Sequence, residues 1–198
     1  MVTRLPGLAR LQDIGAAFYA GACSRDEARA AVMDVIGDQL LCSRVSLWRF
    51  DGVPGALRLL CLASKAPGGE LVTSERSLNE AEYRDYFDVL VRTGMYTGHD
   101  TMHDPHLQPM RDNYLLPGNV LSMLDAAFTV NGRAYGMVCC EQTDRLREWR
   151  AEEIRDLRAL VAKLALLMAA AGDEALWASP SRPMAPIFRR PQDPQGTP

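Results

Sequence analysis

The dipeptide Asn131-Gly132 constrains the fold of this chain more than any other feature, because it lies between two apolar segments, SMLDAAFTV and RAYGMVCCEQ. Asparagine followed by glycine favours the positive φ angles that a two-residue type I′ turn requires at both central positions. The segments are therefore predicted to form an antiparallel hairpin over residues 122–142. If the pairing runs without interruption, alternation gives one face with the bulkier pairs Phe128–Tyr135, Ala126–Met137 and Leu124–Cys139. The opposite face carries the pairs Thr129–Ala134, Ala127–Gly136, Asp125–Val138 and Met123–Cys140.

Apolar periodicity and turn signals predict the other elements of secondary structure. Ser24, followed three residues later by Glu27, forms a capping-box pattern that starts a helix at about residue 25. We expect helices over 7–21, 25–41, 79–93 and 151–171, a short helix near 105–114, and strands over 44–50 and 56–63. This order predicts an α+β sandwich, in which a central antiparallel sheet carries helices on one face and an inserted loop and helix on the other.

The hairpin and the helix after it resemble the C-terminal half of a GAF domain, a family of small-molecule sensor modules. In that family an S-x-L-x-x-x-[IVF] strand, a turn, a G-x-[VL] strand and a W-x-x-E helix follow one another. The matching residues here are Ser122, Leu124, Phe128, Gly136, Val138, Trp149, and Glu152 or Glu153. A first strand, SRVSLWRFD, and a D-x-x-x-D-P element ending at Pro105 extend the resemblance. It implies a regulatory domain of bacterial-type signal transduction that binds a small molecule and is not catalytic.

Three parts of the chain are expected. Residues 1–23 form an N-terminal helix that contributes to a dimer, residues 24–171 form the GAF-like domain, and residues 172–198 form an extended or disordered tail rich in proline. The last helix carries an apolar seam at three- and four-residue spacings, so the first and last helices are expected to hold a homodimer. We further expect a separate output protein.

Composition limits the classes of partner and the compartment. The net charge is −3, which argues against nonspecific binding to nucleic acid or to an anionic membrane surface. No apolar stretch approaches the length of a membrane span, so a cytoplasmic protein is expected. The five cysteines are odd in number and include no C-x-x-C pair, a pattern typical of reduced, buried thiols.

The resemblance implies that a ligand lies between the sheet and residues 79–120. The expected ligand-binding residues combine an aromatic group with the small face of the hairpin: Trp48, Phe50, Tyr83, Phe87, Tyr96, Met123, Asp125, Ala127, Gly136 and Cys140. Asp125 interrupts an apolar strand, where a carboxylate needs a donor; it either anchors a ligand or bonds the covering loop. The small residues admit either a ligand or a closely packed helix.

The sequence assigns no metal and no catalytic residue, and it leaves the cofactor unknown. His99, His103 and His106 lie in one window, but their uneven spacing favours surface residues, and Asp104-Pro105 is typical of a helix N-cap followed by proline. Bilin-binding GAF domains attach their chromophore through a loop cysteine beside a histidine, a pair that this sequence lacks.

Two alternatives to a sensor remain open. One is a dimerisation or interaction module whose pocket is filled by its own side chains. The other is a thiol-dependent enzyme of the methionine sulfoxide reductase type that uses Cys139 or Cys140. These adjacent strand residues should point to opposite faces, and neither has an evident activating cation, so burial is the favoured interpretation.

Overall fold

The computed structural model describes residues 5–170 and 176–177. The helices are α1 (Pro6–Tyr19), α2 (Arg25–Leu40), α3 (Arg84–Thr93), α4 (Leu116–Gly118) and α5 (Ala151–Ala170), with the short helical segments η1 (Pro105–Met110) and η2 (Arg111–Leu115) before α4. The strands are β1 (Arg44–Asp51), β2 (Arg58–Lys65), β3 (Ser77–Asn79), β4 (Met95–Gly98), β5 (Ser122–Val130) and β6 (Arg133–Gln142). In this described part, no helix is both long and apolar enough to cross a membrane.

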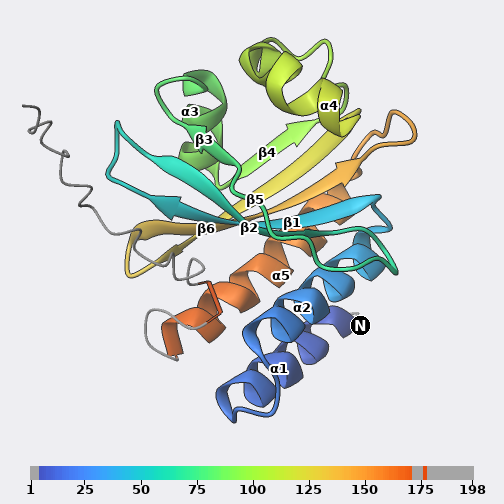
Figure 1. Ribbon diagram of the computed structural model, residues 1–198, viewed down its shortest axis with the longest axis vertical. Coiled ribbons are helices and arrows are strands. Elements are labelled where there is room, and N and C mark those ends of the chain that lie inside the picture. The colour runs from blue at the N-terminus through green and yellow to red at the C-terminus, as the bar shows by residue number, and fades with distance from the viewer. Residues whose placement is uncertain (1–4, 171–175, 178–198) are drawn as a thin grey trace, which may run out of the picture.

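The strands form one antiparallel six-stranded sheet in the order β3-β2-β1-β6-β5-β4. Helices α1, α2 and α5 cover one face, and α3 with the segment η1–α4 covers the other (Figure 1). We call these the helix face and the insertion face. The predicted α+β sandwich, with an inserted loop and helix on the second face, is confirmed.

Local signals account for the best-predicted elements. The Ser24 side chain accepts a hydrogen bond from the Glu27 amide, and the Glu27 carboxylate accepts one from the Ser24 amide, so the capping box starts α2 as expected. At the hairpin, Asn131 and Gly132 have φ angles of 52° and 76°, which are the positive values of a type I′ turn.

The predicted register of the hairpin is wrong beyond its first pairs. Thr129 pairs with Ala134 as expected, but Phe128 then pairs with Gly136, so Tyr135 is an extra residue in β6. Such a bulge moves every later residue of the bulged strand to the opposite face. Gly136 and Cys140 therefore lie on the helix face, whereas Asp125 and Ala127 lie on the insertion face.

Two short strands were not expected, and the helix predicted over 79–93 begins only at Arg84. Ser77–Asn79 pairs with β2, and Met95–Gly98 pairs with β5. Strands of three and four residues are too short to show a period of two in the sequence, so they form because a neighbouring strand supplies their hydrogen-bond partners.

A segment after α5 completes the helix face. Trp177 is 0% exposed; its indole Nε1 donates to the backbone carbonyl of Trp48 at 2.8 Å, and its ring meets Phe128 edge-on at 5.2 Å. Arg29, buried in α2, donates to the carbonyl of Leu176 at 2.9 Å. A Cβ atom on Gly136 would lie 2.4 Å from the Trp177 indole nitrogen, so only glycine admits this ring. The rest of the tail predicted over 172–198 lies outside the described residues.

Candidate functional site

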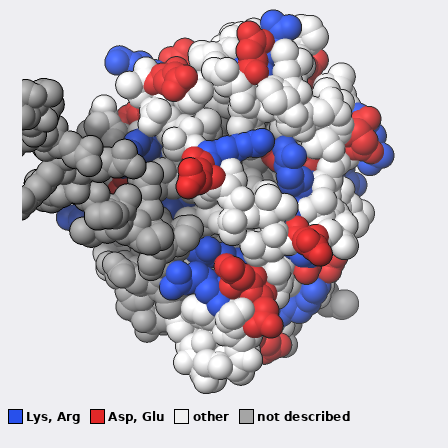
Figure 2. Space-filling model, viewed as in Figure 1, with Lys and Arg blue, Asp and Glu red and all other residues white. Residues whose placement is uncertain are grey.

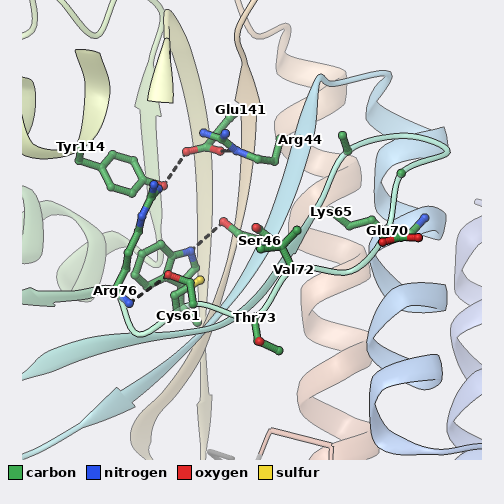
Figure 3. Close-up of a pocket in the computed structure, with 15 residues that line it drawn as sticks. Arg44, Ser46, Cys61, Lys65, Glu70, Val72, Thr73, Arg76, Tyr114 and Glu141 are labelled. Atoms are coloured by element: carbon green, nitrogen blue, oxygen red, sulfur yellow. Dashed lines mark hydrogen bonds and ion pairs between the residues drawn. The ribbon is translucent and has the colours of Figure 1, made fainter. Parts of the chain in front are cut away.

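A cavity of about 490 Å³ opens on the insertion face, where β1, β2 and β6 meet the loop between β2 and β3 (Figure 3). Its volume lies within the range typical of small-molecule sites. The loop supplies one wall, and η2 supplies Tyr114 on the opposite side. The lining residues are Arg44, Ser46, Trp48, Cys61, Ser64, Lys65, Ala66, Gly69, Glu70, Val72, Thr73, Ser74, Arg76, Tyr114 and Glu141.

The wall of the cavity contains a buried ionic network built on Glu141. Arg44 and Glu141 are direct partners across β1 and β6, and the Arg44 Nε donates to the Glu141 carboxylate. Glu141 is 0% exposed and also accepts a hydrogen bond from the Tyr114 hydroxyl at 2.6 Å. Burial, followed by the charge of Glu141, raises the pKa of Tyr114 well above its usual value, so the phenol stays protonated as a donor.

Arg76 lies over this network from the end of the β2–β3 loop. Its guanidinium carbon is 5.7 Å from the centre of the Tyr114 ring, and Figure 3 shows the side chain running beside that ring. The Cys61 amide donates to the Arg76 carbonyl at 2.9 Å, which fixes the backbone from which this side chain extends. Within the described residues, no carboxylate oxygen lies within 4.0 Å of the Arg76 guanidinium.

The loop that closes the cavity is tied to β2 halfway along its length. Ser64 and Val72 exchange two backbone hydrogen bonds of 2.8 and 2.9 Å. Lys65, at the end of β2, pairs with Asp34 of α2, and Glu70 lies near Lys65 on the side of the cavity away from Arg76 (Figure 3). One end of the cavity therefore carries Lys65, its partner Asp34 and Glu70, with more acidic than basic groups. The other end carries Arg44, its partner Glu141 and Arg76, with more basic than acidic groups.

The floor of the cavity combines an indole, a hydroxyl and a thiol. The Trp48 Nε1 donates to the Ser46 Oγ at 2.8 Å, and the Trp48 ring lies 6.1 Å from that of Tyr114. Trp48 and Cys61 pair at an irregularity in the β1–β2 register. Burial, and next the charge of Glu141, raises the pKa of Cys61 to about 11, so this thiol is neutral at physiological pH.

Of the expected ligand-binding residues, Trp48 lines this cavity. The structure places most of the others together on the same face, in the core beneath α3 and η1: Phe50, Tyr83, Phe87, Tyr96, Met123 and, partly buried, Ala127. Gly136 and Cys140 are on the helix face, for the reason given by the bulge at Tyr135. The space expected to hold a ligand beneath α3 is thus occupied by side chains.

Asp125 belongs to that filled region and bonds to the covering helix. Its Oδ2 accepts a hydrogen bond from the Tyr86 hydroxyl of α3 at 2.7 Å, while Oδ1 has no hydrogen-bond partner within the described residues. Burial raises the pKa of Asp125 to about 7, against the lowering contacts of Cys139 and Tyr86. The bond goes to a side chain of the covering helix, whereas the sequence suggested a bond to the covering loop, and the role of Asp125 toward a ligand stays a prediction.

Sequence reasoning missed the charged residues of the cavity, namely Arg44, Lys65, Glu70, Arg76 and Glu141. One signal was available: Glu141 follows directly on the apolar run of β6, where an unpaired carboxylate would be costly to bury. Its partner Arg44 is distant in sequence, so the signal pointed to a buried acid without saying what satisfies it.

The paired cysteines of β6 point to opposite faces, as expected. Cys139 lies in the insertion-face core and Cys140 in the helix-face core. Burial, then the neighbouring Asp125, raises the pKa of Cys139 well above its usual value. A hydrogen bond with Cys42, then burial, raises that of Cys140. Neither thiol has the exposed, electropositive surroundings of a nucleophile.

The three histidines, His99, His103 and His106, make local structural contacts in and around the segment between β4 and β5. The His99 Nδ1 accepts from the Trp149 amide at 3.0 Å, and the His103 Nδ1 lies 2.8 Å from the Asp100 Oδ2. Asp104 caps η1 through the His106 amide, with Pro105 at the first position, as the sequence indicated. Across residues 5–170 and 176–177, no three His, Cys, Asp or Glu side chains are grouped to hold a metal ion.

Comparison with known proteins identifies a matching sequence family and similar folds. The sequence model of the GAF domain matches residues 24–168. The phycocyanobilin-bound GAF domain from a cyanobacterial phytochrome is 16% identical, with a TM-score of 0.63 and coverage of 85% of this chain and 97% of that one. The blue-light absorbing form of the Thermosynechococcus elongatus PixJ GAF domain is 18% identical, with a TM-score of 0.60 and coverage of 82% and 88%.

A third structure comes from a different kind of protein. The GAF domain from Acinetobacter phosphoenolpyruvate-protein phosphotransferase is 18% identical, with a TM-score of 0.58 and coverage of 83% of this chain and 93% of that one. At these identities the likeness is one of fold. No curated protein sequence matches this chain.

Proposed function

Because this chain belongs to the GAF domain family, we propose that it is a sensory or regulatory domain that binds a small molecule in the cavity between β1, β2, β6 and the β2–β3 loop. GAF domains are generally sensory or regulatory. One of the similar structures holds phycocyanobilin, which is a small-molecule chromophore, so the fold is compatible with a bound small molecule. That bilin belongs to the cyanobacterial protein and is not assigned to this chain.

The observation that carries the proposal is the contrast between two parts of the insertion face. Beneath α3 and η1, aromatic and aliphatic side chains fill the space: Tyr86, Phe87, Leu107 and Met110 are each 0% exposed. Beside them, the cavity of about 490 Å³ is lined by hydroxyl, indole and guanidinium groups. A few convergent polar groups around a concave site are typical of small-molecule binding.

Native mass spectrometry of the protein as purified tests the proposal, because it detects a bound compound together with the oligomeric state. A variant that blocks the cavity, Thr73→Trp, should lose the bound compound. Val53→Trp is a matched control, since Val53 is exposed in the β1–β2 loop, away from the cavity. If no compound binds to the native protein, and no compound of a metabolite panel raises its melting temperature, the proposal fails.

We also propose a homodimer formed through α1 and α5, which sequence reasoning suggested. Leu166 of α5 is 67% exposed and lines a groove with Val161, Ala165 and Ala169. Leu8 and Ala9 of α1 line a second groove, which also carries Gln12, Asp13 and Lys163. Apolar side chains that line grooves on both helices favour contact with a second copy. Light scattering should show a dimer that Leu166→Arg converts to a monomer; a native monomer at all concentrations would contradict the proposal. The separate output protein remains part of this proposed function.

A dimerisation module without a ligand is the second candidate. The filled space beneath α3 favours it, as does the hydrogen bond of Asp125 with Tyr86 inside that space. A dimer that binds no compound would support this candidate over the sensor. The burial of Cys139 and Cys140 and their raised pKa values argue against the thiol-dependent enzyme.

A further inference from the structure

We infer that the cavity takes a small organic anion, held through a carboxylate or phosphate group by Arg76. This inference rests on the proposed function and adds the chemical class of the ligand. It follows from counting which hydrogen-bond donors and acceptors around the cavity are already used.

One cation remains without a carboxylate partner at the Tyr114 end of the cavity. Arg76 lines the cavity and has no carboxylate oxygen within 4.0 Å among the described residues. The Arg44 guanidinium gives its Nε to Glu141, and its buried Nη2 lies 3.1 Å from the position of a Cβ atom on Gly118, which does not line the cavity. Arg76 is therefore the free guanidinium that a ligand in the cavity can reach.

Acceptors at this end are already engaged. One oxygen of Glu141 accepts from Arg44 and the other accepts from Tyr114, and the carboxylate is 0% exposed. Glu141 therefore neutralises Arg44 within the wall and leaves Arg76 as an uncompensated cation. The other acid of the lining, Glu70, lies near Lys65 across the cavity (Figure 3). The Tyr114 end thus offers donors and positive charge, which suits an oxyanion.

The guanidinium group fits this role by its shape. It presents parallel N–H donors in a plane, so it binds carboxylate and phosphate oxygens in pairs. The hydroxyl groups of Ser46, Thr73 and Ser74 line the rest of the cavity with Val72 and the Trp48 ring. They can receive the uncharged part of a ligand of metabolite size.

Two pairs of probes that differ in charge test the inference: benzoate against benzamide, and phenyl phosphate against phenol. Binding is followed by nuclear magnetic resonance, through the indole N–H signal of Trp48 and the side-chain N–H signals of arginine. We expect benzoate or phenyl phosphate to shift these signals and the neutral partner of each to leave them unchanged. The arm that responds distinguishes a carboxylate ligand from a phosphate ligand.

The variant Arg76→Gln removes the charge from an exposed residue that forms no ion pair with any of the described residues. It should weaken binding of the responding anion at least tenfold, and raised salt should weaken binding to the native protein. Arg133→Gln, at the hairpin end of β6, is the matched control and should leave binding unchanged.

Each other result overturns the inference. Equal affinity for Arg76→Gln, equal response to the neutral probes, or no response to either anion at tens of millimolar would do so. If a neutral metabolite binds in the cavity and Thr73→Trp abolishes that binding, the proposed function stands while the anionic ligand class is wrong. If neither charged nor neutral compounds bind, both fail together.

Discussion

The two faces of the sheet bury different chemistry. The helix face is covered by aliphatic side chains of α1, α2 and α5, joined by Phe128 and Trp177. The insertion face buries Asp125 and Glu141, each holding a tyrosine hydroxyl, Tyr86 in one case and Tyr114 in the other. Among the described residues, a cavity lined by a buried carboxylate, that of Glu141, is found on the insertion face alone.

This difference indicates how one sheet serves two purposes. Apolar packing on the helix face is non-directional and supplies stability in proportion to buried area. Buried charges on the insertion face add less to stability, because desolvation offsets their attraction, but they fix donors in place. Surface charge does not single out either purpose, since basic and acidic side chains are interspersed among the described residues on the face seen in Figure 2.

The largest expected effect concerns Asp125 and pH. Its pKa is about 7 in the folded chain and 3.8 without burial, so the folded state keeps a proton that the unfolded chain releases as pH rises between these values. Stability is therefore highest at low pH and falls until the carboxyl ionises. Relative to Asp125→Asn, the native protein should lose about 4 kcal/mol of unfolding free energy between about pH 4 and pH 8.

Urea denaturation at a series of pH values measures this difference. Asp144→Asn is the control, because Gln142 lowers the pKa of this exposed carboxyl and its contribution has the opposite sign, being lost as pH falls. Parallel pH profiles for the native protein and Asp125→Asn would show that Asp125 is ionised throughout this pH range and that burial does not raise its pKa.

The next effect comes from breaking the buried ion pair. Arg44→Met leaves Glu141 fully buried with Tyr114 alone and should cost about 3 kcal/mol of unfolding free energy. Arg58→Met, which breaks the exposed pair with Asp51, should cost less than about 1 kcal/mol. Chemical denaturation of both variants gives the comparison. Equal losses would mean that the Arg44–Glu141 pair behaves as a surface pair.

A smaller loss is expected when the helix face is overpacked. In Gly136→Ala the new methyl group would clash with Trp177 and Phe128, both within 3.0 Å, and should cost about 2 kcal/mol. Gly37→Ala in α2 is the matched control, since its nearest neighbour would be 3.7 Å away and alanine favours a helix. Thermal unfolding separates the two; a stable Gly136→Ala would place Trp177 elsewhere.

The smallest effect links Tyr86 to the charge state of Asp125. Tyr86→Phe removes the hydroxyl that donates to Asp125 and should cost about 1.5 kcal/mol where the carboxylate is ionised. Because this bond lowers the pKa of Asp125, the loss should shrink below about pH 6. Denaturation at pH 8 and at pH 5 measures it, and a loss that does not change with pH would contradict the assignment.

Sequence patterns predicted what depends on nearby residues. The capping box at Ser24 and the turn at Asn131 use partners within three residues, and both are present. The bulge at Tyr135 has no such local signal, because the packing of Phe128 and Gly136 against Trp177 comes from a segment distant in the chain. One extra residue was enough to exchange the faces assigned to Gly136 and Cys140.

The candidate site was harder to predict for the same reason. Arg44 and Glu141 meet only because β1 and β6 are neighbours in the sheet, and that pairing joins residues almost a hundred positions apart. The aromatic residues expected around a ligand do gather on one face, but they fill it. The other polar side of the cavity, with Thr73, Ser74 and Arg76, comes from a loop whose sequence shows no periodicity.

Trp177 has a practical consequence for work on isolated domains. The family match ends at residue 168, whereas the buried ring of Trp177 lies nine positions further on. A recombinant fragment that stops at Met168 would leave Phe128 facing water above Gly136, and it would remove the donor to the Trp48 carbonyl. Such a fragment should therefore aggregate or melt early, so the boundary for expression belongs beyond Trp177.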